Sequence, residues 1–285
     1  MKDTILFGDC RETLSQIDEK VRMCVTSPPY YGLRNYGDEG KQIGLEDTPE
    51  EYINNLVNIF RSVRNCLSDD GTLWVNIGDS YYNYRPGKGQ ALVKQTVSAT
   101  KQDLPDKCAR RGNKLEGLKE KDLIGIPWML AFALRADGWY LRQDIIWNKP
   151  NPMPESVRDR CTKSHEYMFL LSKNQNYYFD VDVIKEPTRR KRSVWNINKK
   201  PYKGSHFAVF PPDLIKPCIL AGSEENDIVL DPFIGSGTTA MVARDLGRHY
   251  IGCELHEEYN DLIQQRVPDN KVVHNGLTSA FNDVE

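Results

Sequence analysis

A strand, a glycine-rich turn and a helix follow one another directly in residues 228–244, and this segment constrains the fold more than any other. It reads Ile-Val-Leu-Asp-Pro-Phe-Ile-Gly-Ser-Gly-Thr-Thr-Ala-Met-Val-Ala-Arg. Gly235 and Gly237 have no side chain, so the backbone of the turn can come close to a ligand. A helix that begins at Thr238 directs its first backbone amides at the same ligand. The segment therefore predicts one unit of an α/β fold, with a ligand site at the carboxyl ends of parallel strands.

Acidic residues end two of the predicted strands beside this turn. Asp231 ends the strand of residues 228–231, and Glu254 ends the strand of residues 250–254. Glu254 lies about twenty residues past the turn, where an acid typically holds ribose hydroxyls. Asp231 is placed to bind a cationic group of the ligand. The turn lacks the Lys of a phosphate-binding loop, which disfavours a nucleoside triphosphatase.

A loop with two consecutive prolines follows the short apolar strand predicted for residues 21–25. Residues 25–37 read Val-Thr-Ser-Pro-Pro-Tyr-Tyr-Gly-Leu-Arg-Asn-Tyr-Gly. The prolines end the strand and hold the peptide extended, so the acceptors near Ser27 face outward. Tyr30 adds a ring on which a base can stack. Fixed acceptors beside a ring suit a planar heterocycle with an exocyclic amino group, such as cytosine or adenine. The alternative is a proline-rich turn without chemistry.

Three polar positions at other strand ends leave alternatives open. Asp9 follows the first predicted strand, where it is either a ligand residue or the N-cap of the next helix. Residues 70–79 predict a turn at Asp70 and Gly71 followed by a strand. Asn76 and Asp79, near the end of that strand, either line the pocket or are solvated loop residues, and we favour the second interpretation.

Helical spacing and cysteine positions complete the local predictions. Apolar residues predict helices at residues 49–67, from about Pro127, and around Cys218, while residues 139–147 and 167–171 predict strands. The pair Pro217-Cys218 is shared with enzymes that methylate carbon 5 of cytosine, but its helical position favours a buried core residue. The seven cysteines are widely spaced, so we expect reduced thiols and no metal site.

Positive charge is concentrated in two stretches of a chain whose net charge is -2. Residues 85–121 contain ten Lys or Arg against four Asp or Glu, with few apolar residues, and predict a flexible basic insertion. Residues 185–203 contain eight basic residues and one acid, with Trp195 and Tyr202 between them. A local excess of positive charge on an otherwise acidic chain is typical of a nucleic-acid-binding face. A solvated surface is the alternative.

These motifs resemble those of the DNA amino-methyltransferases, which use S-adenosylmethionine to methylate cytosine N4 or adenine N6. Ser27-Pro-Pro-Tyr30 looks like their catalytic motif IV, and residues 148–166, Asn-Lys-Pro-Asn-Pro-Met-Pro-Glu-Ser-Val-Arg-Asp-Arg-Cys-Thr-Lys-Ser-His-Glu, closely resemble one branch of the family. Residues 228–244 and Glu254 correspond to motifs I and II, and residues 205–215 to motif X. The catalytic motif comes first and the cofactor motif last, which is the permuted order of the β class.

The resemblance implies a single Rossmann-like S-adenosylmethionine-dependent methyltransferase domain over residues 1–285, with a mostly parallel central sheet and helices on both faces. It implies a basic insertion at about residues 85–121 and a DNA-recognition region at about residues 149–205. No metal is implied. The catalytic residues would be Ser27, Pro28, Pro29 and Tyr30. The cofactor-binding residues would be Asp9, His206, Phe207, Asp231, Phe233, Gly235, Ser236, Gly237, Thr238, Thr239 and Glu254. The DNA-binding residues would be Arg158, Arg160, Lys163, His165, Arg189, Arg190, Lys191 and Arg192. For the first four of these, a buried salt-bridge network is the alternative.

The expected reaction is methyl transfer to the exocyclic amine of a base flipped out of duplex DNA. Cytosine N4 is favoured over adenine N6 because family members with Asp or Asn in place of Ser27 mostly act on adenine. Methylation of RNA or of a protein amide, and a catalytically silent DNA-binding protein, are the competing interpretations. We expect a cytoplasmic monomer or homodimer of prokaryotic, archaeal or phage-encoded origin, with a cognate restriction endonuclease as a candidate partner. Residues 1–9 lack the pattern of a signal peptide, and no apolar run is long enough to span a membrane.

Overall fold

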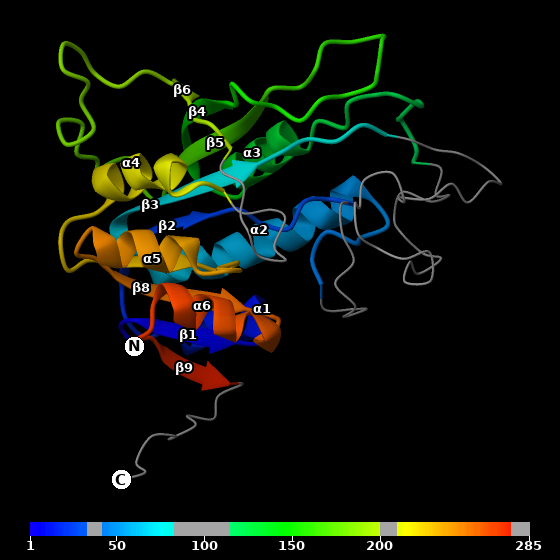
Figure 1. Ribbon diagram of the computed structural model, residues 1–285. Coiled ribbons are helices and arrows are strands. Elements are labelled where there is room, and N and C mark those ends of the chain that lie inside the picture. The colour runs from blue at the N-terminus through cyan, green and yellow to red at the C-terminus, as the bar shows by residue number, and fades with distance from the viewer. Residues whose placement is uncertain (33–41, 83–114, 200–209, 275–285) are drawn as a thin grey trace.

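A computed structural model describes residues 1–32, 42–82, 115–199 and 210–274, and its centre is a twisted sheet (Figure 1). The nine strands lie in the order β6 (Val194–Asn196), β4 (Tyr140–Asn148), β5 (His165–Ser172), β3 (Leu67–Ile77), β2 (Val21–Thr26), β7 (Ile228–Asp231), β8 (His249–Glu254), β1 (Thr4–Phe7) and β9 (Lys271–His274). Strand β5 pairs antiparallel with both β3 and β4, and the other recorded pairings are parallel. The predicted, mostly parallel α/β sheet is confirmed.

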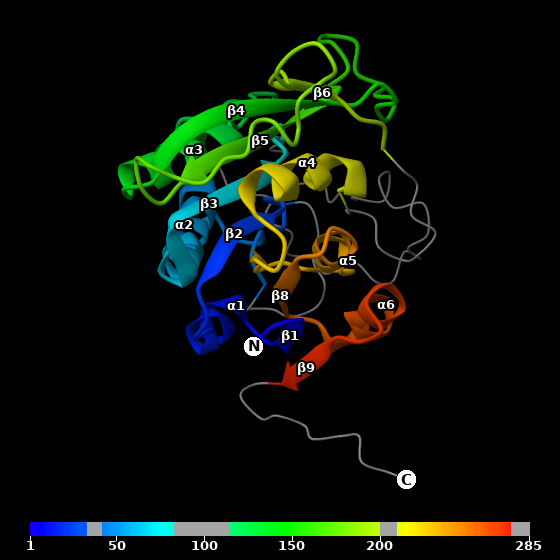
Figure 2. The same cartoon turned by 90° about the vertical axis from the view of Figure 1, so that its left-hand side faces the viewer.

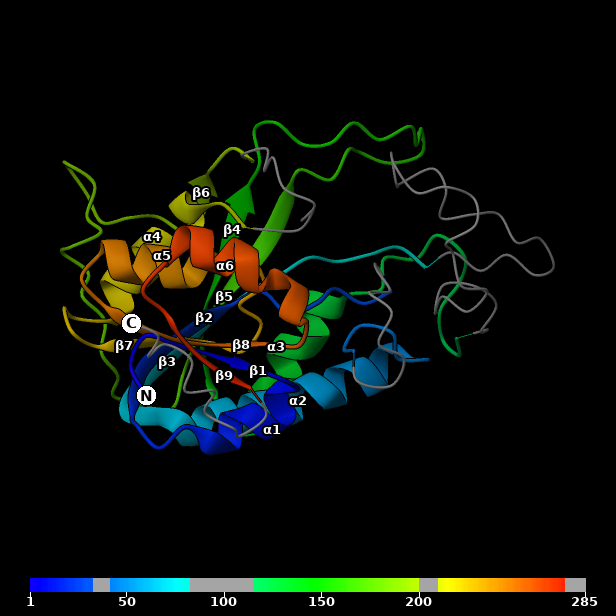
Figure 3. The same cartoon turned by 60° about the horizontal axis from the view of Figure 1, so that its bottom comes forward.

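Helices cover both faces of the sheet, as Figures 2 and 3 show. One face carries α1 (Cys10–Thr13), η1 (Leu14–Gln16), α2 (Pro49–Cys66) and α3 (Ile126–Ala136). The other face carries α4 (Pro212–Gly222), α5 (Thr238–Asp245) and α6 (Asn260–Arg266), with η3 (Glu257–Tyr259) before α6. Because strands of a parallel sheet need crossover connections, the chain alternates between strands and helices through most of its length. None of the described helices is long and apolar enough to cross a membrane.

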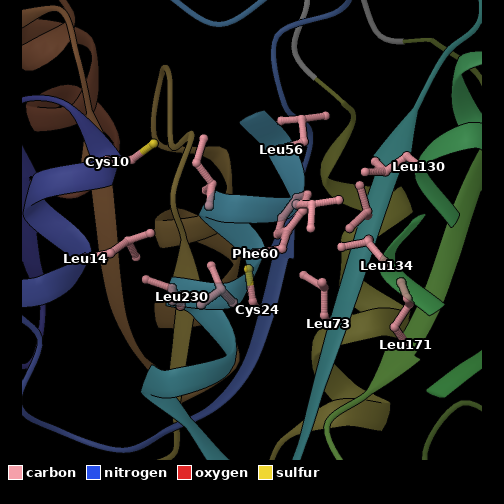
Figure 4. Packing of buried hydrophobic residues seen from close by; sticks show 14 of the residues in the cluster. Cys10, Leu14, Cys24, Leu56, Phe60, Leu73, Leu130, Leu134, Leu171 and Leu230 are labelled. Carbon is pink, nitrogen blue, oxygen red and sulfur yellow. The ribbon is translucent and has the colours of Figure 1, made fainter. Parts of the chain in front are cut away.

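The apolar core follows the predicted helical faces. Leu56 and Phe60 of α2 are fully buried against β3 and the neighbouring α3 (Figure 4). Helix α2 begins where the sequence predicts, because the Thr48 side chain accepts a hydrogen bond from the backbone amide of Glu51 at 3.1 Å. Cys218 lies in α4 with no exposed surface, and burial raises the pKa of its thiol. Its assignment to the core is confirmed.

The turn predicted at Asp70 and Gly71 is wrong, because β3 begins earlier, at Leu67. The two residues lie inside the strand, where the pairing with β2 shifts register between Val21 and Met23. A Cβ at Gly71 would lie 2.9 Å from the carbonyl oxygen of Ser68. The glycine therefore accommodates an irregular strand pairing rather than a chain reversal.

Candidate active site

The strand of the proline loop and the strand of the glycine-rich turn are neighbours in the sheet. Cys24 of β2 pairs with Leu230 of β7, although the two strands are far apart in the sequence. Just beyond this pair, a direct bond joins the two strands: the Thr26 hydroxyl donates to Asp231 Oδ1 at 2.6 Å. Ser27 follows Thr26, so the permuted chain order brings the two predicted motifs to the same edge of the sheet.

Asp231 is the buried centre of the glycine-rich turn. Its side chain is 1% exposed and also accepts hydrogen bonds from the Thr239 hydroxyl at 2.6 Å and from the Phe233 amide at 3.0 Å. Burial raises the pKa of this carboxyl to about 6, against the lowering effect of the three donors. The sequence predicts a bond from Asp231 to a cationic ligand group. In the structure both carboxylate oxygens of Asp231 instead accept hydrogen bonds from the protein itself, and these bonds fix the conformation of the turn.

The backbone of the turn has the conformation that its glycines predict. Gly235 has φ +52° and Gly237 has φ +81°, which side-chain-bearing residues rarely adopt. The carboxylate of Glu254 accepts from the Gly235 amide at 2.9 Å and from the His256 amide at 3.0 Å. Burial raises the pKa of Glu254 to about 7. The acid at the end of β8 thus reaches the turn, and its binding of ribose hydroxyls stays a prediction.

The same turn contains a buried hydroxyl that has no hydrogen bond within the described part of the chain. Ser236 Oγ is buried and has no hydrogen-bond partner among the described residues. Buried polar atoms are nearly always paired in native proteins, so an orphan atom in a glycine-rich turn fits a ligand with polar groups. Together with the half-exposed residues Phe233 and Gly235, it fits the adenosine cofactor that the resemblance implies.

Contacts from α2 and from Gly44 hold the proline loop in place, and the loop keeps the half-exposed Ser27 beside the buried Pro28. The Tyr52 hydroxyl of α2 donates to the Pro29 carbonyl at 2.8 Å, so this carbonyl is already used. Gly44 approaches the loop so closely that a Cβ there would lie 2.9 Å from the Tyr30 carbonyl oxygen. In the described part of the chain no donor reaches the Pro28 carbonyl, and Ser27 is half-exposed. These two groups remain as candidate acceptors for an amine.

Tyr30 is held by a polar network that the sequence does not predict. Its hydroxyl donates to Glu166 Oε2 at 2.8 Å and lies 3.4 Å from Asn76 Oδ1. Glu166 also forms an ion pair with Lys149, which is 7% exposed and whose ammonium lies 4.2 Å from the centre of the Trp147 ring. Burial lowers the pKa of Lys149, and the charge of Glu166 opposes that change. The strand ends of β4 and β5 thus supply an ion pair directly beneath the catalytic motif.

The favoured interpretation of Asn76 and Asp79 as solvated loop residues is wrong for Asn76, whereas Asp79 does lie in a loop after β3 and is half-exposed. Asn76 is 1% exposed and donates to the Tyr167 carbonyl at 3.0 Å, so it lines the Tyr30 network. Asp79 accepts from the amides of Gly125 at 3.0 Å and Ile126 at 3.1 Å. Asp79 therefore caps the N-terminus of α3 and does not line the pocket. It satisfies backbone amides in the first turn of the helix, which have no partner within the helix.

Asp9 has the capping role that was one of its two alternatives. Its side chain accepts from the Arg11 amide at 2.9 Å and forms an ion pair with the Arg11 guanidinium. Asp9 also follows β1, which pairs with β8 so that Phe7 lies opposite Glu254. It therefore lies at the cofactor edge of the sheet, where its binding role remains a prediction.

The predicted DNA-binding residues fall into two groups that the structure does not bring together. Residues 149–164 reach out beyond the carboxyl ends of the strands (Figure 1). In this first group Arg158 is exposed, Arg160 pairs with Glu155 and lies 3.8 Å from the centre of the Tyr81 ring, and Lys163 and His165 are half-buried. Burial lowers the pKa values of Lys163 and His165, and for Lys163 the charges of Asp79 and Glu166 oppose that change.

The second group lies in the connection between β5 and β6, which leaves from the opposite end of the sheet (Figure 1). The Tyr178 amide donates to the Asp70 carbonyl there, at 2.9 Å. Arg189 pairs with Glu186, and the Lys191 ammonium lies 5.0 Å from the centre of the Trp195 ring, whereas Arg190 and Arg192 are exposed. His206, Phe207 and most of the predicted insertion lie outside the described residues.

Comparison with known proteins gives a consistent result. Residues 21–265 match the family model described as DNA methylase. The type II methyltransferase M.SmaI of Serratia marcescens is 53% identical over 276 residues, covering 92% of this chain and 90% of the relative. M.Cfr9I of Citrobacter freundii is 50% identical over 270 residues, covering 93% and 87%.

Two solved structures have a similar fold. PvuII DNA methyltransferase, described as cytosine-N4-specific, has a TM-score of 0.66 at 18% identity, covering 97% of this chain and 96% of its own. A DNA modification methylase of Thermus thermophilus, in complex with S-adenosyl-L-methionine, has a TM-score of 0.64 at 23% identity, covering 98% and 99%. At these identities the likeness shows the fold.

Proposed function

The chain belongs to the DNA methylase family of N4 and N6 amino-methyltransferases, and we propose that it transfers a methyl group to cytosine N4 in duplex DNA. The observation that carries the proposal is the bond between Thr26 and Asp231, which fixes the proline loop beside the glycine-rich turn. A methyl donor held at the turn and an amine held at Ser27 would then be neighbours. Positioning of two reactants in this way supplies a large part of enzymatic rate enhancement.

The cofactor of this reaction is S-adenosyl-L-methionine, which supplies an electrophilic methyl group on sulfur. We assign its ribose to Glu254, and its remaining polar groups to the backbone of Gly235 and the hydroxyl of Ser236. Asp231 acts through the turn, since its oxygens accept from Thr26, Thr239 and the Phe233 amide. The assignment is supported by the orphan Ser236 hydroxyl and by the two left-handed glycines.

The base would enter the site after it leaves the DNA helix. Extrusion of a nucleotide costs a few kcal/mol, and stacking on an aromatic ring such as Tyr30 offsets about 1–3 kcal/mol of that cost. The Ser27 hydroxyl and the Pro28 carbonyl would accept the two hydrogens of the amine. Because the amine lone pair is delocalised into the ring, these acceptors would favour a tetrahedral nitrogen whose lone pair can attack. Arg158, Lys163 and His165 would contact the DNA around the flipped base.

The cytosine assignment rests on Ser27, whose neutral hydroxyl replaces the Asp or Asn that the resemblance associates with adenine. Adenine N6 is the second candidate. The protein would act on DNA in a prokaryotic cytoplasm, as a monomer or homodimer. A cognate restriction endonuclease would be present in the same compartment. The proposal of a restriction partner is supported by the similarity to type II methyltransferases of Serratia marcescens and Citrobacter freundii.

The proposal is tested by methyl transfer from isotopically labelled cofactor. Plasmid DNA, total RNA and bulk protein are offered separately to the wild-type enzyme and to Ser27→Ala. We expect label in DNA with wild type and none with Ser27→Ala, while calorimetry shows unchanged cofactor binding. Tyr31→Phe is the control, because it keeps the ring and removes a hydroxyl that donates to the Asp47 carbonyl at 3.2 Å instead of to a residue of the proposed site. Label in RNA or protein instead of DNA would contradict the proposal.

A further inference from the structure

The hydroxyl of Tyr30 is fixed by polar side chains from two neighbouring strands. It donates to Glu166 Oε2 of β5 at 2.8 Å, and Asn76 Oδ1 of β3 lies 3.4 Å away as a second, weaker acceptor. Burial, followed by the charge of Glu166, raises the pKa of this hydroxyl well above its usual value, while the residue as a whole is half-exposed. The accessible surface of Tyr30 therefore lies away from its hydroxyl.

The ring of Tyr30 is fixed a second time, along one edge. A Cβ at Gly78 would lie 2.7 Å from Tyr30 Cε2 and 3.4 Å from the carboxyl carbon of Glu166. Only a glycine leaves room for the ring at this point. The ring therefore lies against the backbone of Gly78, beside the carboxylate that binds its hydroxyl. The hydrogen bond and the glycine backbone together define one orientation of the ring.

The pairing of β4 with β5 sets the position of Glu166 itself. Trp147 lies opposite Glu166, and the Lys149 amide extends the pairing by donating to the Ser164 carbonyl at 2.7 Å. Because side chains alternate along a strand, Trp147 and Lys149 lie on the same face. The Lys149 ammonium pairs with Glu166 and lies 4.2 Å from the centre of the Trp147 ring. The carboxylate that binds Tyr30 is thus held by its neighbours across the two strands.

Stability is a weak explanation for this ion pair. The Lys149 and Glu166 side chains are 8% and 17% exposed, and desolvation of two such charges offsets their attraction. Burial accordingly lowers the pKa of Lys149, although the charge of Glu166 opposes that change. A carboxylate nevertheless binds a hydroxyl about twice as strongly as a neutral acceptor does. The ion pair therefore suits a role in which the position of Tyr30 matters more than net stability.

We propose that Glu166 and Lys149 are positioning residues that hold the Tyr30 ring in the orientation in which it stacks on the extruded base. The inference rests on the proposed function, because it takes Tyr30 as the ring on which the base stacks. Both residues act through Tyr30, and neither the catalytic motif nor the cofactor motif contains them. A ring whose orientation is fixed in advance loses little conformational freedom when the base arrives, so more of the stacking energy offsets extrusion.

The orientation of the ring should matter after the DNA has bound. Initial binding depends largely on phosphate contacts, whereas stacking on Tyr30 begins only when the base leaves the helix. A loosened ring should therefore slow methyl transfer and leave the affinity for DNA unchanged. Extrusion costs less when the target base has no pairing partner. On such a duplex the same loosened ring should slow the reaction less.

Two changes loosen the ring in different ways. Tyr30→Phe removes the hydroxyl and keeps both the ring and the ion pair. Lys149→Met with Glu166→Leu removes the acceptor and both charges together, so that neither charge is left buried without its partner. Replacement of a whole buried ion pair by apolar residues is often neutral for stability. The second change therefore separates the position of Tyr30 from the stability of the protein, which urea unfolding measures.

Each change has a matched control elsewhere in the chain. Tyr31→Phe is the control for the first, because the hydroxyl that it removes donates to the Asp47 carbonyl. Arg61→Met with Asp137→Asn is the control for the second, because it removes an ion pair between α2 and the C-terminal end of α3.

The methylated sequence is first read from plasmid DNA treated with wild-type protein. Single-turnover methyl transfer is then measured on a short duplex of that sequence, and on the same duplex with an abasic position opposite the target base. Loss of all stacking would slow transfer about 5- to 150-fold, and we expect about 10-fold from Tyr30→Phe and from the double variant on the intact duplex. On the abasic duplex both should approach the wild-type rate. The triple variant should be no slower than the slower of the two, because the bond from Tyr30 to Glu166 is already lost.

Calorimetric affinities for cofactor and DNA, and the rates of both controls, should stay at wild-type values. A wild-type rate on the intact duplex in either variant would overturn the proposal. An equal loss on the two duplexes, or a triple variant that loses the product of the two effects, would do the same. If the double variant does not fold, Tyr30→Phe still decides, because it leaves the ion pair intact. A wild-type protein that labels no DNA would instead overturn the proposed function.

Discussion

Replacement of Thr26 with Val removes the hydroxyl that joins the catalytic strand to the cofactor strand. Thr26 has no exposed surface, and Val has nearly the same shape, so the change deletes the 2.6 Å bond to Asp231 and little else. Thr4→Val is the matched control in another strand. Thr4 is 2% exposed, and its hydroxyl donates to the neutral Lys2 carbonyl at 3.2 Å.

The expected cost follows from the charge of the acceptor. A hydrogen bond to a charged group contributes about 1.5–3 kcal/mol to stability, and one between neutral groups about 0.5–1.5 kcal/mol. We expect Thr26→Val to lower the free energy of unfolding by about 1.5–3 kcal/mol at about pH 8, where Asp231 is ionised. That is a large part of the roughly 5–15 kcal/mol that stabilises a typical protein.

The cost should depend on pH in one direction. Burial raises the folded-state pKa of Asp231 to about 6, so the stability linked to its proton is present at low pH and is lost as pH rises through 6. Because the Thr26 bond lowers this pKa, Thr26→Val raises it further, and the variant loses more stability over the same range. At about pH 5 the cost should fall toward that of a neutral bond, about 0.5–1.5 kcal/mol.

Urea unfolding at about pH 8 and at about pH 5 measures how much Thr26→Val lowers the free energy of unfolding at each pH. Equal m-values for wild type and variant check that only stability changed. The cost of Thr4→Val should be the same at both. The reasoning would be refuted by a Thr26→Val cost no larger than that of Thr4→Val at about pH 8, or by a cost that does not fall at about pH 5.

Three further outcomes follow from the site. Gly78→Ala should lower methyl transfer and leave cofactor affinity unchanged, because a Cβ there would lie 2.7 Å from Tyr30 Cε2; an unchanged rate in the transfer assay would contradict this. Arg190→Ala with Arg192→Ala should reduce the slope of log DNA affinity against log salt by about two if both bind phosphates, and an unchanged slope identifies a solvated face. Cofactor affinity by calorimetry should rise with pH through about 7, because ribose hydroxyls favour the ionised form of Glu254; a flat profile would contradict the ribose assignment.

The parts that sequence predicted well are those that local pattern dictates. Gly235 and Gly237 signalled positive φ, the helical periodicity of residues 49–67 indicated α2, and the prolines after Ser27 ended β2. Each of these depends on neighbours within a few residues. The turn at Asp70 failed for the same reason, since the pairing of β3 with β2 overrides the local preference of an Asp-Gly pair.

The contacts beneath the loop were not predictable from one sequence. Tyr30 meets Glu166 136 residues later in the chain, and Asn76 meets Tyr167 91 residues later. Lys149 and Glu166 both lie in residues 148–166, the stretch that closely resembles one branch of the family. That stretch contains several other charged residues, so the sequence did not indicate that these two form a pair. Only the antiparallel pairing of β4 with β5, which sets Trp147 opposite Glu166, shows that their strand ends coincide. Polar residues at strand ends were the one available signal, and it did not single out these two.

The central claim is that the amine at Ser27 is cytosine N4. Plasmid DNA from a host without methyltransferases is incubated with the pure protein and S-adenosyl-L-methionine, digested to nucleosides and separated by mass spectrometry. We expect N4-methylcytosine, which should be absent from DNA treated with Ser27→Ala. N6-methyladenine without N4-methylcytosine would contradict the account of the target base.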